Sequence, residues 1–459
     1  MARILLVSSG RGRENTLGNA ALENLGLGYL ASFLTGNGCE IGIIDQSFDP
    51  CLDADLVTVV SHEQVDLVGI SSMTWCSDEA ISGARAIKQA CPSVRLVAGG
   101  AGPTAFPEYF EPHFDYVVVG EGEVTMLGIV RGELGRGIIR AERNTVWNGL
   151  PLPVHPRSLV DGHKLHMRGT WPMARSEQLP VSLSGSRGCP NACSFCLSEA
   201  MWGRRVIKRS PGDVAIEIEI LVGLGYNSFD FTDLNLNLDA GWLIGLCDAI
   251  RERGLNKKAI FGGLWNPAIT KRMDEVIPAC AAAGFVMLSI GVESPNQMGR
   301  ARLNKQKSDT DATFRVFEMM ADVGITTRML FIVGSPGQTE TDIEEMVDFA
   351  TASRTSELRI SIHTPFPGTR DWADAEIQRR ITTRDWALYD TAHQVMRSEL
   401  GDVAGARLHV LSSFYNSARY RENRAALIAK NPAFEVGYRQ LEGGFLVANN
   451  LIEPANRLV

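Results

Sequence analysis

The sequence of 459 residues predicts an α/β protein with two successive parallel sheets: a doubly wound, Rossmann-like domain, then a partial (β/α)6 barrel, then helices. Short, continuously apolar stretches alternate with helical patterns through residues 1–135 and again through 181–370. This alternation is typical of parallel strands covered by helices. Residues 136–180 lose the periodicity and carry several prolines, which indicates a linker. Residues 371–459 are expected to form helices that cap the open side of the barrel.

The first domain is expected to contain five buried strands, at residues 4–7, 40–45, 65–71, 94–98 and 116–119. In doubly wound sheets, ligands bind outside the carboxyl ends of the strands. Several of these ends carry small residues, which let a large flat ligand approach the backbone. The same glycines also suit tight strand-to-helix turns. The residues expected to contact such a ligand are Ser72, Thr74, Trp75, Gly99, Gly100, Gly120 and Glu121.

Three cysteines, Cys189, Cys193 and Cys196, follow a short strand at residues 181–183. Three thiolates on one tight loop favour a metal site. A four-iron cluster takes four ligands, so this loop leaves one iron open to another molecule. A structural zinc site would usually need a second Cys-x-x-Cys pair, and the other cysteines stand singly along the sequence.

The run Cys-x-x-x-Cys-x-Phe-Cys, with Phe195 before its last cysteine, resembles the cluster loop of radical S-adenosylmethionine (radical SAM) enzymes. The resemblance implies a [4Fe–4S] cluster on the three cysteines and SAM bound to the open iron. It also implies cleavage of SAM to a 5′-deoxyadenosyl radical, which abstracts hydrogen from a substrate. Phe195 would then lie near the adenine of SAM.

Beyond the cysteines, strands are expected at residues 229–232, 259–262, 286–291, 327–333 and 357–363. Reactive groups of β/α barrels lie at the carboxyl ends of the strands. By the resemblance, Asp233 there would meet the amino group of SAM, and Glu293 its ribose or amino group. Gly334 and Gly337 would shape the adenine or methionine pocket. A capping role for Glu293 at the start of a helix is the alternative.

Cys247 and His363 are further candidates for contact with the substrate, with simple packing as the alternative for each. A group of carboxylates also lies at or near the second strand of the barrel, and it could hold the ammonium groups of an aminoglycoside-like substrate. These are Glu217, Glu219, Asp230, Asp233 and Asp239.

Within the first domain, Val68-Gly69-Ile70-Ser71, Val97-Ala98-Gly99-Gly100 and residues 115–123 resemble the cobalamin-binding domain that precedes the barrel in B12-type radical SAM enzymes. The Asp-x-His-x-x-Gly loop that supplies a histidine to cobalt in mutases is missing after the first strand. Cobalamin would therefore bind without that histidine, with Trp75 covering its lower face. The alternatives are that Trp75 merely fills a loop and that the domain keeps the fold without the cofactor.

Two reactions are compatible with these features. The first is cobalamin-dependent C-methylation of a small natural-product intermediate, as in antibiotic biosynthesis. The second is a radical dehydration, deoxygenation, epimerisation or cyclisation of a sugar or aminoglycoside-like substrate, with a B12-type domain that need not bind cobalamin. A simple iron–sulfur electron carrier would not need the β/α units.

The composition indicates which classes of binding partner the protein can have. The net charge is −8 without a basic run, which gives no electrostatic footprint for nucleic acid and favours a neutral or cationic small substrate. Cysteines that must stay reduced predict a cytoplasmic protein, and no stretch suggests a signal peptide or a membrane span. The resemblance implies a reducing electron donor of the flavodoxin or ferredoxin type.

Overall fold

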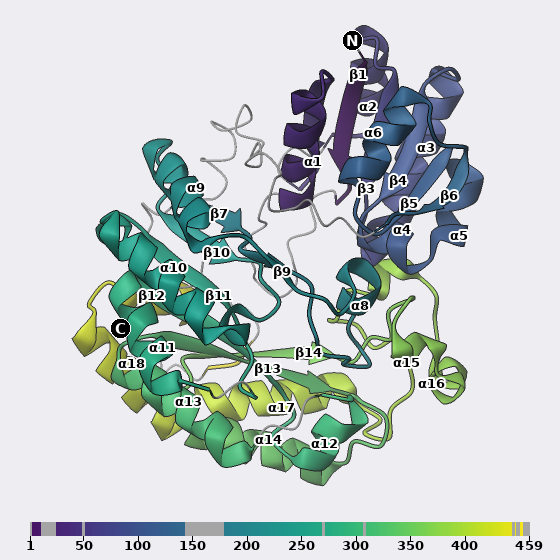
Figure 1. Cartoon of the computed structure of the whole chain (residues 1–459). Helices are drawn as coiled ribbons and strands as arrows, with labels where there is room; N and C mark the ends of the chain where they lie inside the picture. The colour runs from purple at the N-terminus through teal and green to yellow at the C-terminus, as the bar shows by residue number, and fades with distance from the viewer. Residues whose placement is uncertain are drawn as a thin grey trace.

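The computed structural model describes residues 2–10, 24–47, 51–142, 179–268, 271–305, 309–442, 446 and 450–452. Its two parallel sheets form two domains with a shared boundary (Figure 1). Most of the expected linker, residues 143–178, lies outside the described residues. No helix in the described part of the chain is both long and apolar enough to cross a membrane.

The first sheet has six parallel strands in the order β2-β1-β3-β4-β5-β6. The five expected strands are all present: β1 (Arg3–Ser8), β2 (Glu40–Asp45), β3 (Leu67–Ser71), β4 (Arg95–Gly99) and β5 (Tyr116–Val119). The strand order reverses between β1 and β3, and such a switch point opens a crevice for a ligand.

Two separate hydrophobic cores confirm the doubly wound architecture. Helices α1 (Leu25–Gly36) and α6 (Glu123–Arg131) cover one face of the sheet, where Leu34 and Ile129 are buried. Helices α2 (Asp53–His62), α3 (Ser77–Ala90) and α5 (Pro107–Phe110) cover the other face. Because helices cover both faces, the strands read as continuous apolar runs in the sequence.

The sixth strand, β6 (Gly137–Arg140), corrects the expected domain boundary. It pairs in parallel with β5 and so extends the first domain beyond residue 135, into the segment predicted to be a linker. None of the four residues of this edge strand is fully buried, so its apolar pattern is weak.

The second sheet also has six parallel strands, in the order β14-β13-β12-β11-β10-β7. These are β7 (Pro180–Leu183), β10 (Ser228–Phe231), β11 (Ile260–Trp265), β12 (Phe285–Glu293), β13 (Thr326–Val333) and β14 (Glu357–Ile362). The helices between them are α9 (Pro211–Gly223), α10 (Ala240–Glu252), α11 (Met273–Ala283), α13 (Thr310–Asp322) and α14 (Glu340–Ala352). In the part of the chain that is described, β7 and β14 do not pair, so the barrel is open as predicted.

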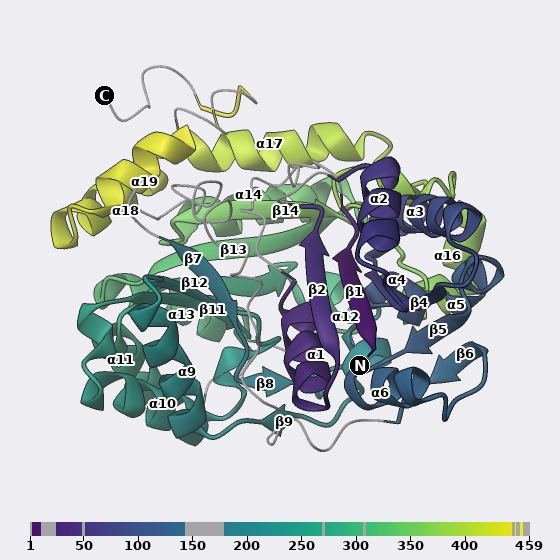
Figure 2. The same ribbon diagram turned by 90° about the horizontal axis from the view of Figure 1, so that it is seen from above.

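The C-terminal helices do not form the predicted cap. Helix α17 (Val403–Tyr415) packs against β14 and lies beside α14 (Figure 2), and α18 (Ala418–Lys430) and α19 (Phe434–Leu441) follow it. The Tyr415 hydroxyl bonds to both backbone groups of Leu358 in β14. Helix α17 therefore serves as the sixth barrel helix. An amphipathic helix has the same sequence pattern whether it packs against the barrel sheet or covers the open side of the barrel.

The segment between β14 and α17 lies against the first domain instead. It contains α15 (Arg370–Ala373), α16 (Ala375–Arg380) and a short turn, Trp386–Leu388. The Trp386 ring lies 4.7 Å from that of Phe106, beside α5. This aromatic contact fixes the first domain next to the barrel.

Candidate active site

The three predicted cysteine ligands lie on one loop between β8 (Ser186–Arg187) and α8 (Ser198–Trp202). Their thiols are free, and Cys189 is buried. The loop is held by its neighbours: the Ser194 amide donates to the Leu303 carbonyl at 3.0 Å, and the Asp371 amide donates to the Ser194 carbonyl at 3.0 Å. Phe195 is part of the same loop and is half-buried.

The three cysteine thiols of this loop suit an iron–sulfur cluster. Burial raises the pKa of the Cys193 thiol to about 11; the nearby Lys305 lowers it, while Cys196, Glu293 and Cys189 raise it further. Among the described residues, no three His, Cys, Asp or Glu side chains gather closely enough to hold one metal ion. A four-iron cluster spreads its ligands over the corners of a cube, so its thiols need not converge on a point.

Asp233 positions the start of this loop. It lies just beyond β10 and is fully buried. One carboxylate oxygen accepts from the Gly185 amide at 2.8 Å, and the other accepts from the Ser186 hydroxyl. Burial raises the pKa of Asp233 to about 6. Each oxygen accepts a hydrogen bond from the chain itself, so Asp233 positions the loop, and its contact with SAM stays a prediction.

Glu293 points toward the cysteine loop from the end of β12. The β12–β13 pairing shifts register between Gly291 and Glu293, and Glu293 has a φ of 63°, a backbone strain often found at functional sites. Its Oε1 accepts from Lys305 Nζ at 2.9 Å. A Cβ on Gly291 would lie 2.8 Å from that oxygen and 3.0 Å from Lys305 Nζ, so any other residue there would force the Glu293–Lys305 pair to shift. The next helix, α12 (Gln297–Arg302), is capped by Asn296, so Glu293 is not its cap.

The turn predicted at the end of β13 is present. Gly334 has a φ of 82° and donates its amide to Gln338 Oε1 at 2.6 Å. A side chain at Gly334 would collide with Val403 of α17, which lies 2.8 Å from the Cβ position. Gly337 has a φ of 71° and donates to Glu399 at 3.0 Å. Both glycines are therefore required by the backbone.

Cys247 and His363, the two further candidates for contact with the substrate, have protein neighbours instead. Cys247 lies in α10 with its sulfur 3.9 Å from that of Cys280 in α11, so it belongs to the helix layer and that prediction is wrong. His363 is buried between Asp371, at 2.8 Å, and Ser335, at 3.0 Å. Because Asp371 also bonds the cysteine loop, His363 braces that loop from the end of β14.

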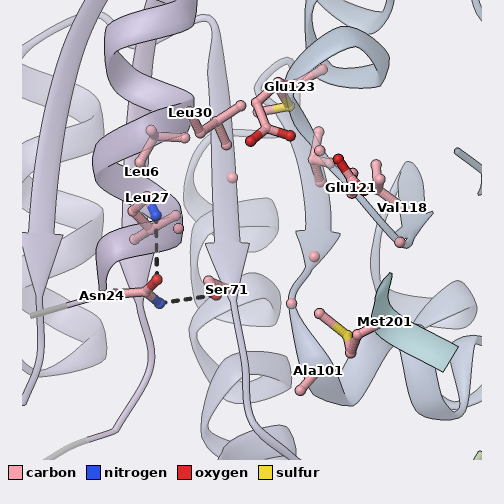
Figure 3. A pocket seen from close by; sticks show the side chains of 18 of the residues that line it. Leu6, Asn24, Leu27, Leu30, Ser71, Ala101, Val118, Glu121, Glu123 and Met201 are labelled. Atoms are coloured by element: carbon pink, nitrogen blue, oxygen red, sulfur yellow. Dashed lines mark hydrogen bonds between the residues drawn. The ribbon is translucent and has the colours of Figure 1, made fainter. Parts of the chain in front are cut away.

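A second candidate site is a cavity of about 280 Å³ at the carboxyl ends of β1, β3, β4 and β5 (Figure 3). Four of the predicted contacts line it: Gly99, Gly100, Gly120 and Glu121. Asn24 closes its base at the switch point, since its amide nitrogen donates to Ser71 Oγ at 3.1 Å.

The other three predicted contacts do not line this cavity. Ser72 donates its amide to the Gly99 carbonyl, and Thr74 and Trp75 lie in a short helical turn, Thr74–Cys76. Met73 lines the cavity instead and is 42% exposed. The expectation that Trp75 covers a ligand there is therefore not supported. A one- or two-residue error of this kind arises because a helical turn rotates neighbouring side chains apart.

Three cavity residues come from the second domain: Arg187, Met201 and Trp202. Arg187 Nη1 lies 2.8 Å from Glu123 and 3.5 Å from Glu121. Its guanidinium stacks 4.9 Å from the ring centre of Tyr29 and 5.1 Å from that of Trp202. Arg187 precedes Cys189 by two residues, so the strand that leads into the cysteine loop is also a wall of the cavity. The spacing of residues in the sequence could not predict that Arg187 pairs with Glu123.

The cavity wall fits a large flat ligand. Gly99 and Gly122 line it, and a Cβ at either position would meet no atom within 4 Å, so both face open space. Gly100 has a φ of 95°, and its Cβ position lies 2.8 Å from Ser71 Oγ. The glycines thus form a cradle, and apolar residues such as Leu27, Leu30 and Met126 supply most of the remaining wall. Such a cradle suits a corrin ring.

Comparison with known proteins agrees with this two-site arrangement. Residues 19–130 match the family described as B12 binding domain, and residues 183–350 match the Radical SAM superfamily. An uncharacterised methyltransferase of Pyrococcus horikoshii is 28% identical over 394 residues, 81% of this chain and 83% of the relative. The anaerobic magnesium-protoporphyrin IX monomethyl ester cyclase of Rubrivivax gelatinosus is 26% identical over 426 residues, 87% of this chain and 74% of the relative.

A solved structure supports the fold. The radical S-adenosylmethionine methyltransferase TsrM from Kitasatospora setae, with cobalamin and a [4Fe–4S] cluster bound, superposes with a TM-score of 0.69. The alignment covers 99% of this chain and 92% of that protein, at 18% sequence identity.

Proposed function

We propose that this chain, which belongs to the radical SAM enzymes that carry a B12-binding domain, is a cobalamin-dependent methyltransferase acting on carbon in a small organic molecule. The observation that carries the proposal is the shared wall between the two sites. Arg187, two residues before Cys189, is ion-paired with Glu123 across the cavity of the first domain. Methyl transfer needs its two cofactor sites side by side, and this ion pair holds the domains in that arrangement.

The cofactors of this family are SAM and a [4Fe–4S] cluster, with cobalamin in the first domain. When bound, they supply reductive cleavage of SAM and a carrier for the methyl group. Cys189, Cys193 and Cys196 would hold the cluster, and Glu293 with the turn from Gly334 to Gly337 would hold SAM. A small-molecule substrate and a one-electron donor of the flavodoxin or ferredoxin type complete the proposal.

The chain itself contributes placement and charge. Asp233 and His363 fix the cysteine loop from two strand ends, through Ser186 and Asp371 respectively. The Lys305 cation lies beside Glu293, and the two side chains are only 12% and 11% exposed, which limits the access of bulk water to the pair. A buried, water-poor site protects radical chemistry from side reactions.

One argument for an aminoglycoside-like substrate, the group of carboxylates near the second barrel strand, is weakened by the contacts that these side chains make. The carboxylates predicted to hold ammonium groups have other partners. Asp233 binds the loop, Asp239 caps α10 and pairs with Lys208, Glu217 pairs with Arg209, and Glu219 pairs with Arg253 on the surface. Asp230, on β10, also has an interaction partner, so these carboxylates are not available as a group to bind the ammonium groups of a polycationic substrate.

The test of the proposed function is metal content followed by transfer of label. Protein purified without oxygen from cells supplied with cobalamin should carry about four irons, the count of one [4Fe–4S] cluster, and about one cobalt per chain. Incubation with a reductant and SAM deuterated in its methyl group should then place the labelled methyl on the extracted cobalamin, measured by mass spectrometry. Iron without cobalt, and SAM cleaved only to 5′-deoxyadenosine, would favour a radical reaction without methylation.

Glu293→Gln is expected to weaken SAM binding about tenfold or more while leaving the iron content unchanged. Glutamine keeps the volume but loses the charge that balances Lys305 and would attract the SAM ammonium, and bonds to charged groups contribute about 1.5–3 kcal/mol. Isothermal titration of the reconstituted protein with SAM measures the effect. Glu219→Gln, which changes a surface carboxylate, is the control. SAM affinity equal to that of the wild type would assign Glu293 a purely structural role.

A further inference from the structure

The buried side chain of His363 connects two parts of the barrel that are distant in sequence. His363 follows β14 directly and is 3% exposed. Its Nδ1 lies 3.0 Å from Ser335 Oγ, and its Nε2 lies 2.8 Å from an oxygen of Asp371. Its backbone amide donates to the Val333 carbonyl at 2.8 Å, which continues the pairing of β14 with β13. The imidazole is therefore fixed through its backbone and at both ring nitrogens.

On one side, the imidazole holds the turn at the end of β13. Ser335 lies in that turn, between Gly334 and Gly337, and its side chain is buried. Ser335 also lines a small cavity together with Ser294, the neighbour of Glu293. The two segments proposed to hold SAM, which are the end of β12 and this turn, therefore come together at Ser335. The contact with Nδ1 fixes the turn at that point.

On the other side, the imidazole holds the segment that supports the cysteine loop. Asp371 lies in α15, and its backbone amide donates to the carbonyl of Ser194, which follows the second of the three cysteines. The bond from His363 to Asp371 spans eight positions, and Pro365 and Pro367 restrict the backbone between them. The position of α15, and with it that of the cysteine loop, therefore depends on His363.

The donors and acceptors of this bridge are complementary. A carboxylate only accepts hydrogen bonds, so the proton is assigned to Nε2 of His363, which donates to Asp371. The Ser335 hydroxyl can either donate to Nδ1 or accept from it, so it is a suitable partner for Nδ1 with or without a proton. Because the ring is rigid and both nitrogens are engaged, it sets the spacing between the turn that contains Ser335 and the helix that supports the cysteine loop.

We propose that His363 is a positioning residue that keeps the SAM turn, Gly334 to Gly337, at the correct spacing from the cysteine loop. SAM has to reach from this turn to the open iron on the loop, and reacting groups misplaced by about 1 Å can lose about 100-fold in rate. The inference rests on the proposed function in placing SAM at this turn. It adds the residue that couples the two supports of SAM.

Three variants of His363 cut the bridge at one end or at both. The amide nitrogen of glutamine takes the place of Nε2, so His363→Gln keeps the bond to Asp371 and loses the contact with Ser335. The amide nitrogen of asparagine takes the place of Nδ1, so His363→Asn keeps the contact with Ser335 and loses the bond to Asp371. His363→Ala removes both. Each variant is studied as the full-length protein, reconstituted without oxygen.

All three variants should keep about four irons per chain, because the cysteines are unchanged. In His363→Ala, kcat for 5′-deoxyadenosine formation with dithionite as the reductant should fall about 10–100-fold, the usual cost of losing a residue that orients a metal ligand. KM for SAM should change much less, because the turn itself remains. His363→Gln and His363→Asn should each lose less than His363→Ala. Electron paramagnetic resonance of the reduced cluster should show a weaker response to added SAM in His363→Ala than in the wild type.

Ser335→Ala tests the same bridge from its other end. Because both substitutions break one bridge, the double variant Ser335→Ala/His363→Ala should lose no more activity than His363→Ala alone, whereas independent effects would multiply. The control is His409→Ala, which changes an exposed histidine of α17 that pairs with Glu344 of α14. It should keep the kcat and the resonance spectrum of the wild type.

Three results would overturn the proposal and assign His363 to packing alone: a wild-type kcat in His363→Ala, multiplied losses in the double variant, or iron lost in parallel with activity. Each is distinguishable from failure of the proposed function, because the readout is SAM cleavage and not methyl transfer. Protein that cleaves SAM in a His363-dependent manner but transfers no methyl group keeps this inference and loses the methyltransferase assignment. Protein that transfers the methyl label equally well without His363 loses only this inference.

Discussion

Replacing Cys193 by alanine is expected to remove the iron–sulfur cluster and abolish SAM cleavage. Cys193 is the middle one of three thiols on the only loop expected to hold the cluster, and three ligands are the minimum that leaves one iron for SAM. Losing a residue that merely orients a metal ligand usually costs about 10–100-fold. Loss of a ligand itself should therefore reduce 5′-deoxyadenosine formation at least about 100-fold.

The measurement combines iron content, visible absorbance and chromatography of 5′-deoxyadenosine, all under anaerobic conditions. Cys280→Ala is the matched control, since Cys280 is a buried thiol between α10 and α11, away from the loop. It should keep its iron and its activity. A Cys193→Ala protein that remained brown and cleaved SAM normally would disprove the assignment of the ligands.

The sequence predicted the strands well because both sheets are parallel and buried. All eleven expected strands are found close to the predicted residues, from β1 to β14. Continuous apolar runs between helices leave few other structures open. Strands β8 and β9 (Ile207–Lys208) were missed because they have two residues each, and β6 was missed because none of its residues is fully buried.

The candidate sites were predictable only where a motif lies within one segment. The cysteine loop, the Gly334 turn and the Gly99-Gly100 turn are of this kind. Arg187 with Glu123, and Ser335 with His363, come together through the tertiary fold across 64 and 28 positions. Trp75 shows the reverse error: it is near a site in sequence, but a helical turn places it outside the cavity lining.

Replacing Gly99 by leucine is expected to prevent cobalamin binding without disturbing the barrel. Gly99 ends β4 in the cavity wall, and a Cβ there would meet no atom within 4 Å. The leucine side chain can therefore extend into the cavity of about 280 Å³ without straining the fold. Gly100 would be a poor choice, because its positive φ and the nearby Ser71 would strain any side chain. Cobalt content should fall at least about tenfold, the effect of about 1.4 kcal/mol in binding.

The Gly99→Leu protein separates the two cofactor sites functionally. Its iron content and its formation of 5′-deoxyadenosine should match those of the wild type, because the cysteine loop is untouched, whereas the labelled methyl should no longer be transferred. Gly36→Leu is the control: Gly36 ends α1 in the same domain, is exposed, and also has no atom within 4 Å of its Cβ position. Unchanged cobalt in Gly99→Leu would mean that cobalamin, if bound, lies outside this cavity. Equal loss in both variants would instead indicate a general weakening of the first domain, which thermal denaturation would detect.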